Sequence, residues 1–154
     1  MLRLMSLPVL AAAFALPSYG ELLSANEIIL AIEGRWALAY EDDPEPENRF
    51  RCDDLAIHIQ IDEIDGDLVY RSRHEGQESY YTSPVLTDVL NNGQTAPWIR
   101  LHYDSEDRLT EEGEPLEWRL IMPDENTFFW ARTDWEWGLT TKPRRRCLAQ
   151  APGM

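Results

Sequence analysis

The sequence is poor in the residue patterns that catalytic and metal sites use. Its 154 residues include only three histidines and two cysteines, and the cysteines form no Cys-x-x-Cys pair. Neither a Gly-x-Ser-x-Gly nucleophile motif nor a glycine-rich phosphate-binding loop occurs. Pairs of carboxylates are too common in so acidic a chain to mark a catalytic site. The sequence therefore predicts no enzyme activity, no catalytic residue, no metal site and no cofactor.

Basic residues are also scarce. The chain has 14 Lys and Arg against 28 Asp and Glu, which gives a formal net charge of −14. A surface of this sign repels phosphate backbones and anionic lipid head groups. The composition excludes nucleic acid as a partner, and it accounts for solubility in simple terms.

Only one long apolar run is present, at residues 4–16, and it follows the basic Arg3. The small residues Ser18 and Gly20 then precede a cleavage position ahead of Glu21. This order of charged, apolar and small segments is typical of a secretory signal peptide. A bilayer span needs about 20 apolar residues, so the run is too short for a membrane anchor. We expect a signal peptide at residues 1–20, a periplasmic or secreted protein, and no membrane span.

The two cysteines, Cys52 and Cys147, are far apart in the sequence. In an oxidising compartment an even number of cysteines favours a disulfide bond. A bridge closing a loop of roughly 95 residues stabilises a fold by about 4–5 kcal/mol in chain-entropy models. A redox or metal-binding thiol pair is the alternative, and the wide spacing argues against it.

The exported part, residues 21–154, is predicted to be one domain that begins with a short helix. Ser24 is a suitable N-cap, and Glu27 three residues later completes a capping box. Leu23 and Ile28 are spaced to form a hydrophobic staple. Gly34 stands where a C-cap glycine would end the helix.

After Gly34 the apolar spacing changes from helical to alternating, which predicts β-strands. About eight strands joined in sequence can close into an antiparallel up-and-down barrel, which leaves no exposed edge. A two-sheet sandwich is the alternative, and the short hairpin links favour the barrel. The expected strands lie at residues 35–40, 55–62, 67–73, 77–83, 98–103, 116–122, 127–133 and within 144–149.

The short helix followed by Gly34-x-Trp36 resembles the calycins, the superfamily that contains the lipocalins. The resemblance implies that Trp36 closes the bottom of the barrel and that an arginine from the last strand packs across it. Arg144, Arg145 and Arg146 are the candidates for that arginine, with Arg144 and Arg146 selected as barrel-closing residues. A guanidinium over an indole face gains cation–π energy, roughly 1–2 kcal/mol when water is excluded.

A second likeness to lipocalins is Thr133-Asp134-Trp135, which is similar to their Thr-Asp-Tyr turn. Lipocalins have two full strands after that turn, and this chain has room for fewer residues there. Trp135 and Trp137 lie close by in the sequence. Exposed, they would mark a protein contact or a glycan-stacking site; buried, they would belong to the end of the barrel, which we favour.

Strand alternation places a set of aromatic side chains inside the barrel. An eight-stranded barrel is just wide enough to be filled by side chains or to hold one small ligand. The aromatic set therefore either lines a pocket for an apolar or aromatic molecule or simply fills the interior. The ligand-binding candidates are Tyr40, Tyr70, Tyr103, Trp118 and Trp130.

The function that these features predict is non-covalent binding of a small apolar or aromatic ligand by an exported, lipocalin-like barrel. The alternative is a protein-binding module with a packed barrel, such as a secreted inhibitor or an envelope assembly factor. Calycin-shaped bacterial inhibitors carry their disulfide over a short span near the start, unlike the Cys52 and Cys147 spacing here. The volume of the barrel interior separates the two hypotheses, because only the first requires an open cavity.

Overall fold

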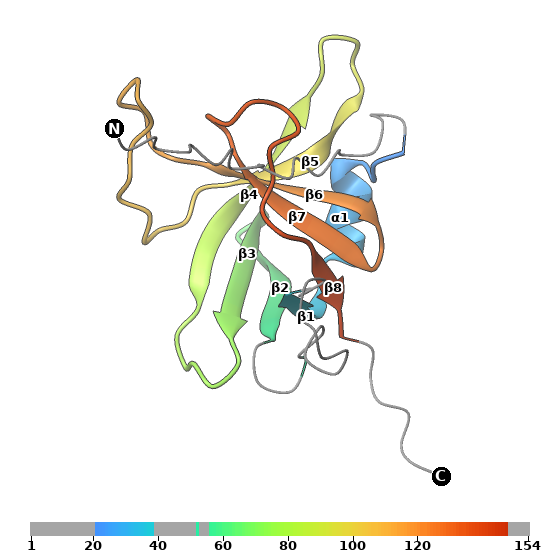
Figure 1. Ribbon diagram of the computed structural model, residues 1–154, viewed down its shortest axis with the longest axis vertical. Helices are drawn as coiled ribbons and strands as arrows, with labels where there is room; N and C mark the ends of the chain where they lie inside the picture. The colour runs from blue at the N-terminus through green and yellow to red at the C-terminus, as the bar shows by residue number, and fades with distance from the viewer. Residues whose placement is uncertain (1–20, 39–51, 53–55, 148–154) are drawn as a thin grey trace, which may run out of the picture.

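The structure, a computed structural model, describes residues 21–38, 52 and 56–147 (Figure 1). These residues form one helix and eight antiparallel strands, each paired with its neighbours in sequence, and β1 pairs with β8 to close the barrel. The predicted closed barrel is confirmed, and the sandwich alternative is wrong. No helix within the described part is long and apolar enough to cross a membrane. The elements are α1 (Ala25–Ala31), β1 (Gly34–Leu38), β2 (Ile57–Ile64), β3 (Asp67–His74), β4 (Tyr81–Val89), β5 (Thr95–Leu101), β6 (Trp118–Asp124), β7 (Thr127–Arg132) and β8 (Arg144–Arg146).

Two expectations fall outside the described residues. The segment predicted to be the signal peptide, residues 1–20, is one of them. The ligand-binding candidate Tyr40, in the link between β1 and β2, is the other. The structure therefore carries no statement on either.

The capping box of α1 forms as predicted. The backbone N–H of Ser24 donates to the Glu27 carboxylate at 2.8 Å, and the Ser24 hydroxyl accepts from the Glu27 backbone N–H. The Ser24 hydroxyl also donates to the Glu27 carboxylate at 2.6 Å, and this bond, with the one from the Ser24 backbone N–H, lowers the pKa of Glu27. The predicted C-cap is wrong, because the helix is capped by Ile32 and Gly34 is already the first residue of β1.

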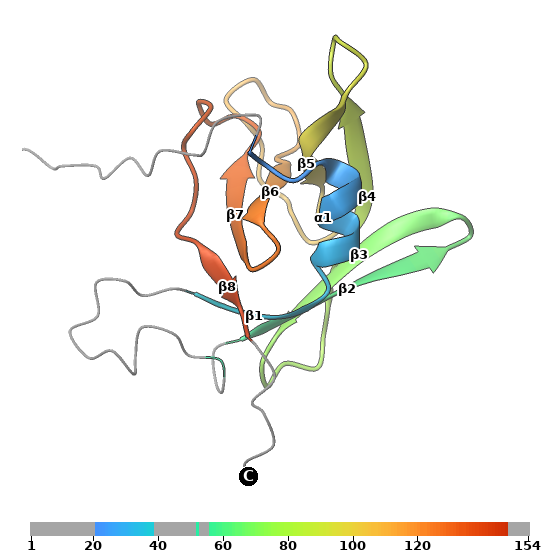
Figure 2. The ribbon, with the colours of Figure 1, turned by 90° about the vertical axis from the view of Figure 1, so that its right-hand side faces the viewer.

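Helix α1 covers one end of the barrel, which we call the closed end. Its residues Ala25, Ile28 and Ile32 are fully buried, in the same core as the inward-facing strand residues. The helix packs beside β4 and β5 (Figure 2). The Leu23 backbone N–H donates to the Met122 carbonyl at 2.9 Å, which ties the start of the helix to β6. A helix this short is not stable alone, so this burial holds it in place.

Several strand boundaries differ from the expected ones. The strand expected at residues 77–83 is wrong at its start, because residues 77–80 belong to the β3–β4 link and β4 continues to Val89. The strand expected at residues 116–122 is shifted, since β6 begins at Trp118 and continues to Asp124. Pro84 and Pro123 lie within these two strands and do not end them.

The predicted disulfide between Cys52 and Cys147 is present. Cys147 directly follows β8, and its backbone N–H donates to the Arg35 carbonyl of β1 at 2.7 Å. The Arg35 guanidinium in turn donates to the Cys52 carbonyl at 2.6 Å. The bridge therefore lies beside the seam where the first and last strands meet.

Candidate functional site

The closed end of the barrel is built around Trp36. This side chain is fully buried, and its indole N–H donates to the Ile32 carbonyl at 2.8 Å. Phe128 packs edge-to-face against it, with ring centroids 5.0 Å apart. The Arg146 guanidinium lies over the indole at 4.3 Å from the ring centroid. The interior at this end is therefore filled by side chains.

Arg146, rather than Arg144, is the arginine that lies across Trp36. It donates to the Glu33 carbonyl at 2.8 Å and the Glu125 carbonyl at 2.9 Å, and also to the Ala31 carbonyl. Gly34 allows this approach: it has φ of +135°, and a Cβ there would lie 2.9 Å from Arg146 Nη1. Burial lowers the pKa of Arg146. This arginine holds backbone groups and is not available to a ligand.

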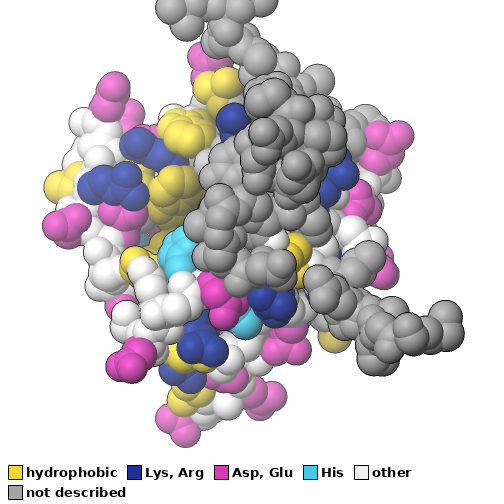
Figure 3. Space-filling model, turned by 60° about the horizontal axis from the view of Figure 1, so that its bottom comes forward, with side chains coloured by type: hydrophobic (Ala, Val, Ile, Leu, Met, Phe, Trp, Pro, Cys, Tyr) yellow, Lys and Arg dark blue, Asp and Glu magenta, His cyan; other side chains and the backbone are white. Residues whose placement is uncertain are grey.

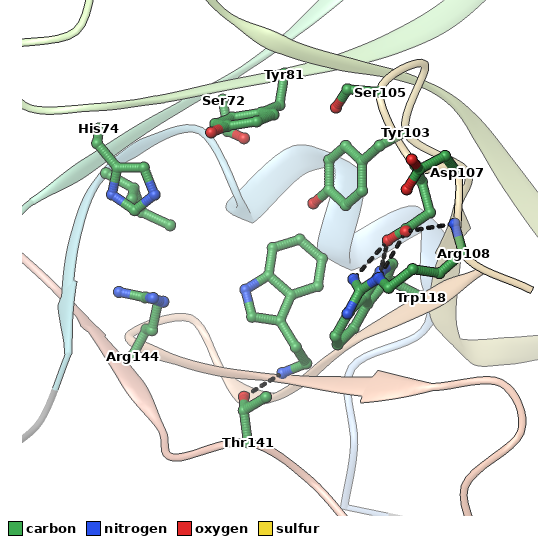
Figure 4. A pocket seen from close by; sticks show the side chains of 13 residues that line it. Ser72, His74, Tyr81, Tyr103, Ser105, Asp107, Arg108, Trp118, Thr141 and Arg144 are labelled. Carbon is green, nitrogen blue, oxygen red and sulfur yellow. Dashed lines mark hydrogen bonds and ion pairs between the residues drawn. The ribbon is translucent and has the colours of Figure 1, made fainter. Parts of the chain in front are cut away.

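The opposite end of the barrel contains an open cavity of about 540 Å³, and we call this region the open end (Figure 4). Its walls come from the start of β2, β4, β6 and β8, from the end of β3, from β7 and from the loops after β5 and β7. The volume lies within the range typical of small-molecule pockets. The lining residues are Ile57, Ser72, His74, Tyr81, Tyr103, Ser105, Glu106, Asp107, Arg108, Trp118, Trp130, Thr141 and Arg144.

Aromatic rings form much of the pocket wall. Tyr103 packs edge-to-face against Tyr81 at 6.4 Å and Trp130 at 6.1 Å, and Trp130 meets Trp118 at 6.5 Å. Edge-to-face contacts hold rings at fixed angles, so the wall is preorganised. Three of the predicted ligand-binding residues, Tyr103, Trp118 and Trp130, therefore line the cavity together. Tyr70 is fully buried against Tyr103 and Trp130 and does not line the cavity itself.

Hydroxyl groups gather on one side of the cavity. The Tyr70 hydroxyl lies close to those of Ser72 and Tyr103 but makes no hydrogen bond of ordinary geometry. Burial raises the pKa of both Tyr70 and Tyr103 well above the usual value. Both phenols therefore stay protonated at neutral pH, and Tyr103 can present a hydrogen-bond donor to the cavity.

Arg144 and His74 stand on the same wall of the pocket (Figure 4). Partial burial lowers the pKa of His74, and the positive charge of Arg144 lowers it further. The Arg144 charge also acts on Tyr70 and Tyr103. At neutral pH this wall therefore combines a cationic guanidinium with a neutral imidazole, whose ring packs against Tyr81 at 6.4 Å.

The facing wall carries an ion pair. Arg108 donates to both carboxylate oxygens of Glu106 at 2.7 Å, and the Trp118 indole N–H donates to Glu106 at 3.3 Å. The hydrogen bonds from Arg108 are the main reason that the pKa of Glu106 falls to about 2. Each charge of this pair is neutralised by the other. Asp107 lies at the exposed rim beside it.

Some pocket residues were missed at the sequence level. His74 continues the alternation of Tyr70 and Ser72 along β3, so extending that pattern by one step would have placed it inside. Glu106 and Arg108 lie in the link between β5 and β6, where no periodic signal exists. Their position follows only from the fold.

Trp135 and Trp137 do not share one environment. Trp135 is half-buried against Trp118, with ring centroids 6.1 Å apart. Trp137 is 48% exposed and packs on Trp98 at 5.2 Å on the outside of the barrel. The expectation that both are buried is therefore wrong for Trp137, because these residues lie in a loop and do not alternate as a strand would.

Within residues 21–38, 52 and 56–147, no group of three or more His, Cys, Asp or Glu side chains is arranged to hold a metal ion. The site is thus defined by a barrel with one filled end and one open, aromatic-walled end. No family model, curated protein or solved structure matches this chain.

Proposed function

We propose that this protein is an exported, lipocalin-like barrel that binds a small apolar or aromatic ligand non-covalently. The observation that carries the proposal is the cavity of about 540 Å³ at the open end. This volume is in the range of pockets that hold a small molecule, and it opens between side chains of the barrel. The open interior favours the ligand-binding hypothesis over a packed barrel.

The pocket walls suit a ligand with a flat or apolar body. Tyr103, Trp118 and Trp130 offer ring edges and faces on several sides of the space. Moving apolar surface from water onto such walls gains about 25 cal/mol per Å². Hydroxyls at Ser72 and Tyr103 are among the polar groups that can orient a ligand in this site.

The closed end supports the lipocalin-like part of the proposal. Gly34, Trp36 and Arg146 are arranged as the resemblance implies, with the guanidinium across the indole. The disulfide and the signal-like segment support export, since disulfides persist outside the reducing cytosol.

The proposal is tested by fluorescence titration with N-phenyl-1-naphthylamine, an uncharged probe that brightens in apolar sites. We expect saturable binding with one site per chain. Trp118→Leu should weaken the affinity about tenfold, because Trp118 lines the cavity. The matched control is Trp98→Leu, which changes a tryptophan on the outer face of β5. No saturable binding, or an affinity that depends on Trp98 instead of Trp118, would reject the proposal.

One observation favours the alternative, a protein-binding module. Trp137 is 48% and Leu139 46% exposed, and Trp137 packs on Trp98 outside the barrel. Exposed tryptophan is common at the centre of protein interfaces. This alternative becomes the better one if the uncharged probe fails to bind the wild-type protein.

A further inference from the structure

Three hydroxyl groups meet at the wall of the pocket. Tyr70 and Ser72 are two residues apart on β3, and both are buried on the inward face of the strand. Tyr103, which follows β5, packs edge-to-face on Tyr70 with ring centroids 6.0 Å apart. Ser72 and Tyr103 line the cavity, and Figure 4 shows the Tyr103 hydroxyl pointing toward its middle. We call Tyr70, Ser72 and Tyr103 the hydroxyl cluster.

The Tyr70 hydroxyl is buried without a proper partner. It lies near the hydroxyls of Ser72 and Tyr103, but no group meets it with ordinary hydrogen-bond geometry. Burying a hydroxyl in this way destabilises a fold, and phenylalanine at the same place would avoid the cost. An unsatisfied buried group in a cluster that borders a cavity points to a partner that a ligand supplies.

The cluster has more donors than its own members can use in a row. Each hydroxyl carries one O–H donor. Burial raises the pKa of Tyr70 and of Tyr103, so both phenols keep their protons at neutral pH. When three hydroxyls donate one to the next, the last donor remains for an outside acceptor. A carbonyl oxygen suits this place, because it has two lone pairs and no proton of its own.

An uncharged ligand fits this chain better than an anion. The net charge is −14, and acidic side chains are spread over the surface, as the face in Figure 3 shows. At the cavity, Glu106 and Arg108 neutralise each other through hydrogen bonds of 2.7 Å. Arg144 also lines the cavity but already interacts within the protein, so we assign it no contact with the ligand.

Resting on the function proposed above, we propose that the pocket binds an uncharged aromatic carbonyl compound. Its oxygen accepts hydrogen bonds from the Tyr103 and Ser72 hydroxyls, and its aromatic body lies against Trp118 and Trp130. Tyr70 acts as a positioning residue, because its hydroxyl orients the two donors from the buried side. The ligand class is that of aryl ketones and aldehydes.

The test compares two ligands of one shape. 2-Acetylnaphthalene carries the carbonyl, and 2-isopropenylnaphthalene has a CH₂ group in place of the oxygen. Each is titrated against bound N-phenyl-1-naphthylamine, and the ratio of the two affinities isolates the contribution of the oxygen. Tyr103→Phe should shift this ratio about fivefold against the ketone, the usual net effect of one neutral hydrogen bond. Ser72→Ala should shift it in the same direction.

Tyr80→Phe is the matched control. Tyr80 lies outside the cavity in the link between β3 and β4, where the Arg71 guanidinium lies over its ring. This change should leave the ratio as it is in the wild-type protein.

Tyr70→Phe separates a positioning role from a structural one. It should shift the ratio against the ketone while the urea midpoint of unfolding stays the same or rises, because an unsatisfied buried hydroxyl is removed. A lower midpoint with an unchanged ratio would mean that the Tyr70 hydroxyl serves the fold and not the ligand.

The outcomes separate this inference from the proposed function. If N-phenyl-1-naphthylamine does not bind the wild-type protein, the proposed function fails and the inference with it. If that probe binds but the ketone does not displace it, the carbonyl preference is wrong while the pocket remains. The same conclusion follows if Tyr103→Phe and Ser72→Ala leave the ratio unchanged, or if Tyr80→Phe shifts it equally.

The wild-type protein decides the matter if Tyr103→Phe does not fold. Hydrogen bonding lowers the infrared stretching frequency of a carbonyl. Bound 2-acetylnaphthalene, labelled with carbon-13 at the carbonyl, should therefore absorb at a lower frequency than it does in cyclohexane. Equal frequencies would overturn the inference.

Discussion

Two arginines on β8 point into the same barrel and meet opposite environments. Arg144 and Arg146 are two residues apart, so strand alternation turns both inward while Arg145 faces solvent. Arg146 lies over Trp36 at the closed end and donates to three backbone carbonyls. Arg144 lines the cavity at the open end.

The difference shows how one strand can serve both stability and binding. At the closed end the partly buried Arg146 has its donors used by backbone carbonyls, as a charge partly removed from water requires. At the open end the aromatic rings pack edge-to-face and leave a cavity beside them. We therefore expect substitutions at the closed end to change stability, and substitutions at the open end to change binding.

The largest effect should come from the disulfide, which fastens the strand seam beside the closed end. Replacing both Cys52 and Cys147 by Ser should lower the free energy of unfolding by about 4 kcal/mol, because the bridge limits a long loop in the unfolded chain. Urea denaturation measures the loss. The affinity for the uncharged probe should stay within twofold of wild type. A parallel loss of affinity would mean that the two ends are not independent.

The next effect contrasts the two arginines directly. Arg146→Gln should cost about 2–3 kcal/mol, because it removes the cation–π contact and leaves the carbonyls of Glu33 and Glu125 short of a donor. Arg144→Gln should cost less, since Arg144 lines a water-accessible cavity, where solvent can reach a group that loses its partner. Thermal and urea unfolding of both variants give the comparison.

A reversed order of these two losses would break the contrast between the ends. It would mean that Arg144 supports the fold and that the cavity depends on it for shape.

The closed barrel could be predicted from the sequence, because the patterns that indicate it are local and repeated. Alternation along residues 57–61 specifies a strand, and Asp65-Gly66, which both have positive φ in the structure, form the tight turn that joins it to the next one. The disulfide followed from counting cysteines in an exported chain. These features can be recognised from short stretches of sequence or from the number of cysteines, and the structure confirms the barrel and the disulfide.

The pocket was harder to predict from the sequence, because its shape depends on which inward side chains leave space. Alternation placed Tyr103, Trp118 and Trp130 inside but did not separate Tyr70, which is packed, from the others, which line the cavity. The Glu106–Arg108 pair reaches the site through a loop. Loop position is set by the closure of the whole barrel, so no sequence period predicts it.

The smallest expected effect is a pH dependence at the open end. His74 faces Arg144 from β8 and the Tyr81 ring from β4, and its partial burial together with the Arg144 charge lowers its pKa below the usual 6.5. The unfolded chain therefore takes up the proton more readily than the folded one. The contribution of His74 to stability is complete above the ordinary pKa, and it is lost as the pH falls below 6.5 toward the lowered value.

His74→Gln removes this titration while keeping a polar side chain at the rim. We expect the wild-type protein to lose more stability than the variant when the pH falls from about 7.5 to about 5.5, as measured by urea unfolding at each pH. The loss is small because His74 is exposed at the rim, where solvent screens its charge. Arg144→Gln should also reduce the dependence of stability on pH, because it removes one of the two causes of the lowered pKa of His74. Equal slopes in all three proteins would show that the positive charge of Arg144 does not affect His74.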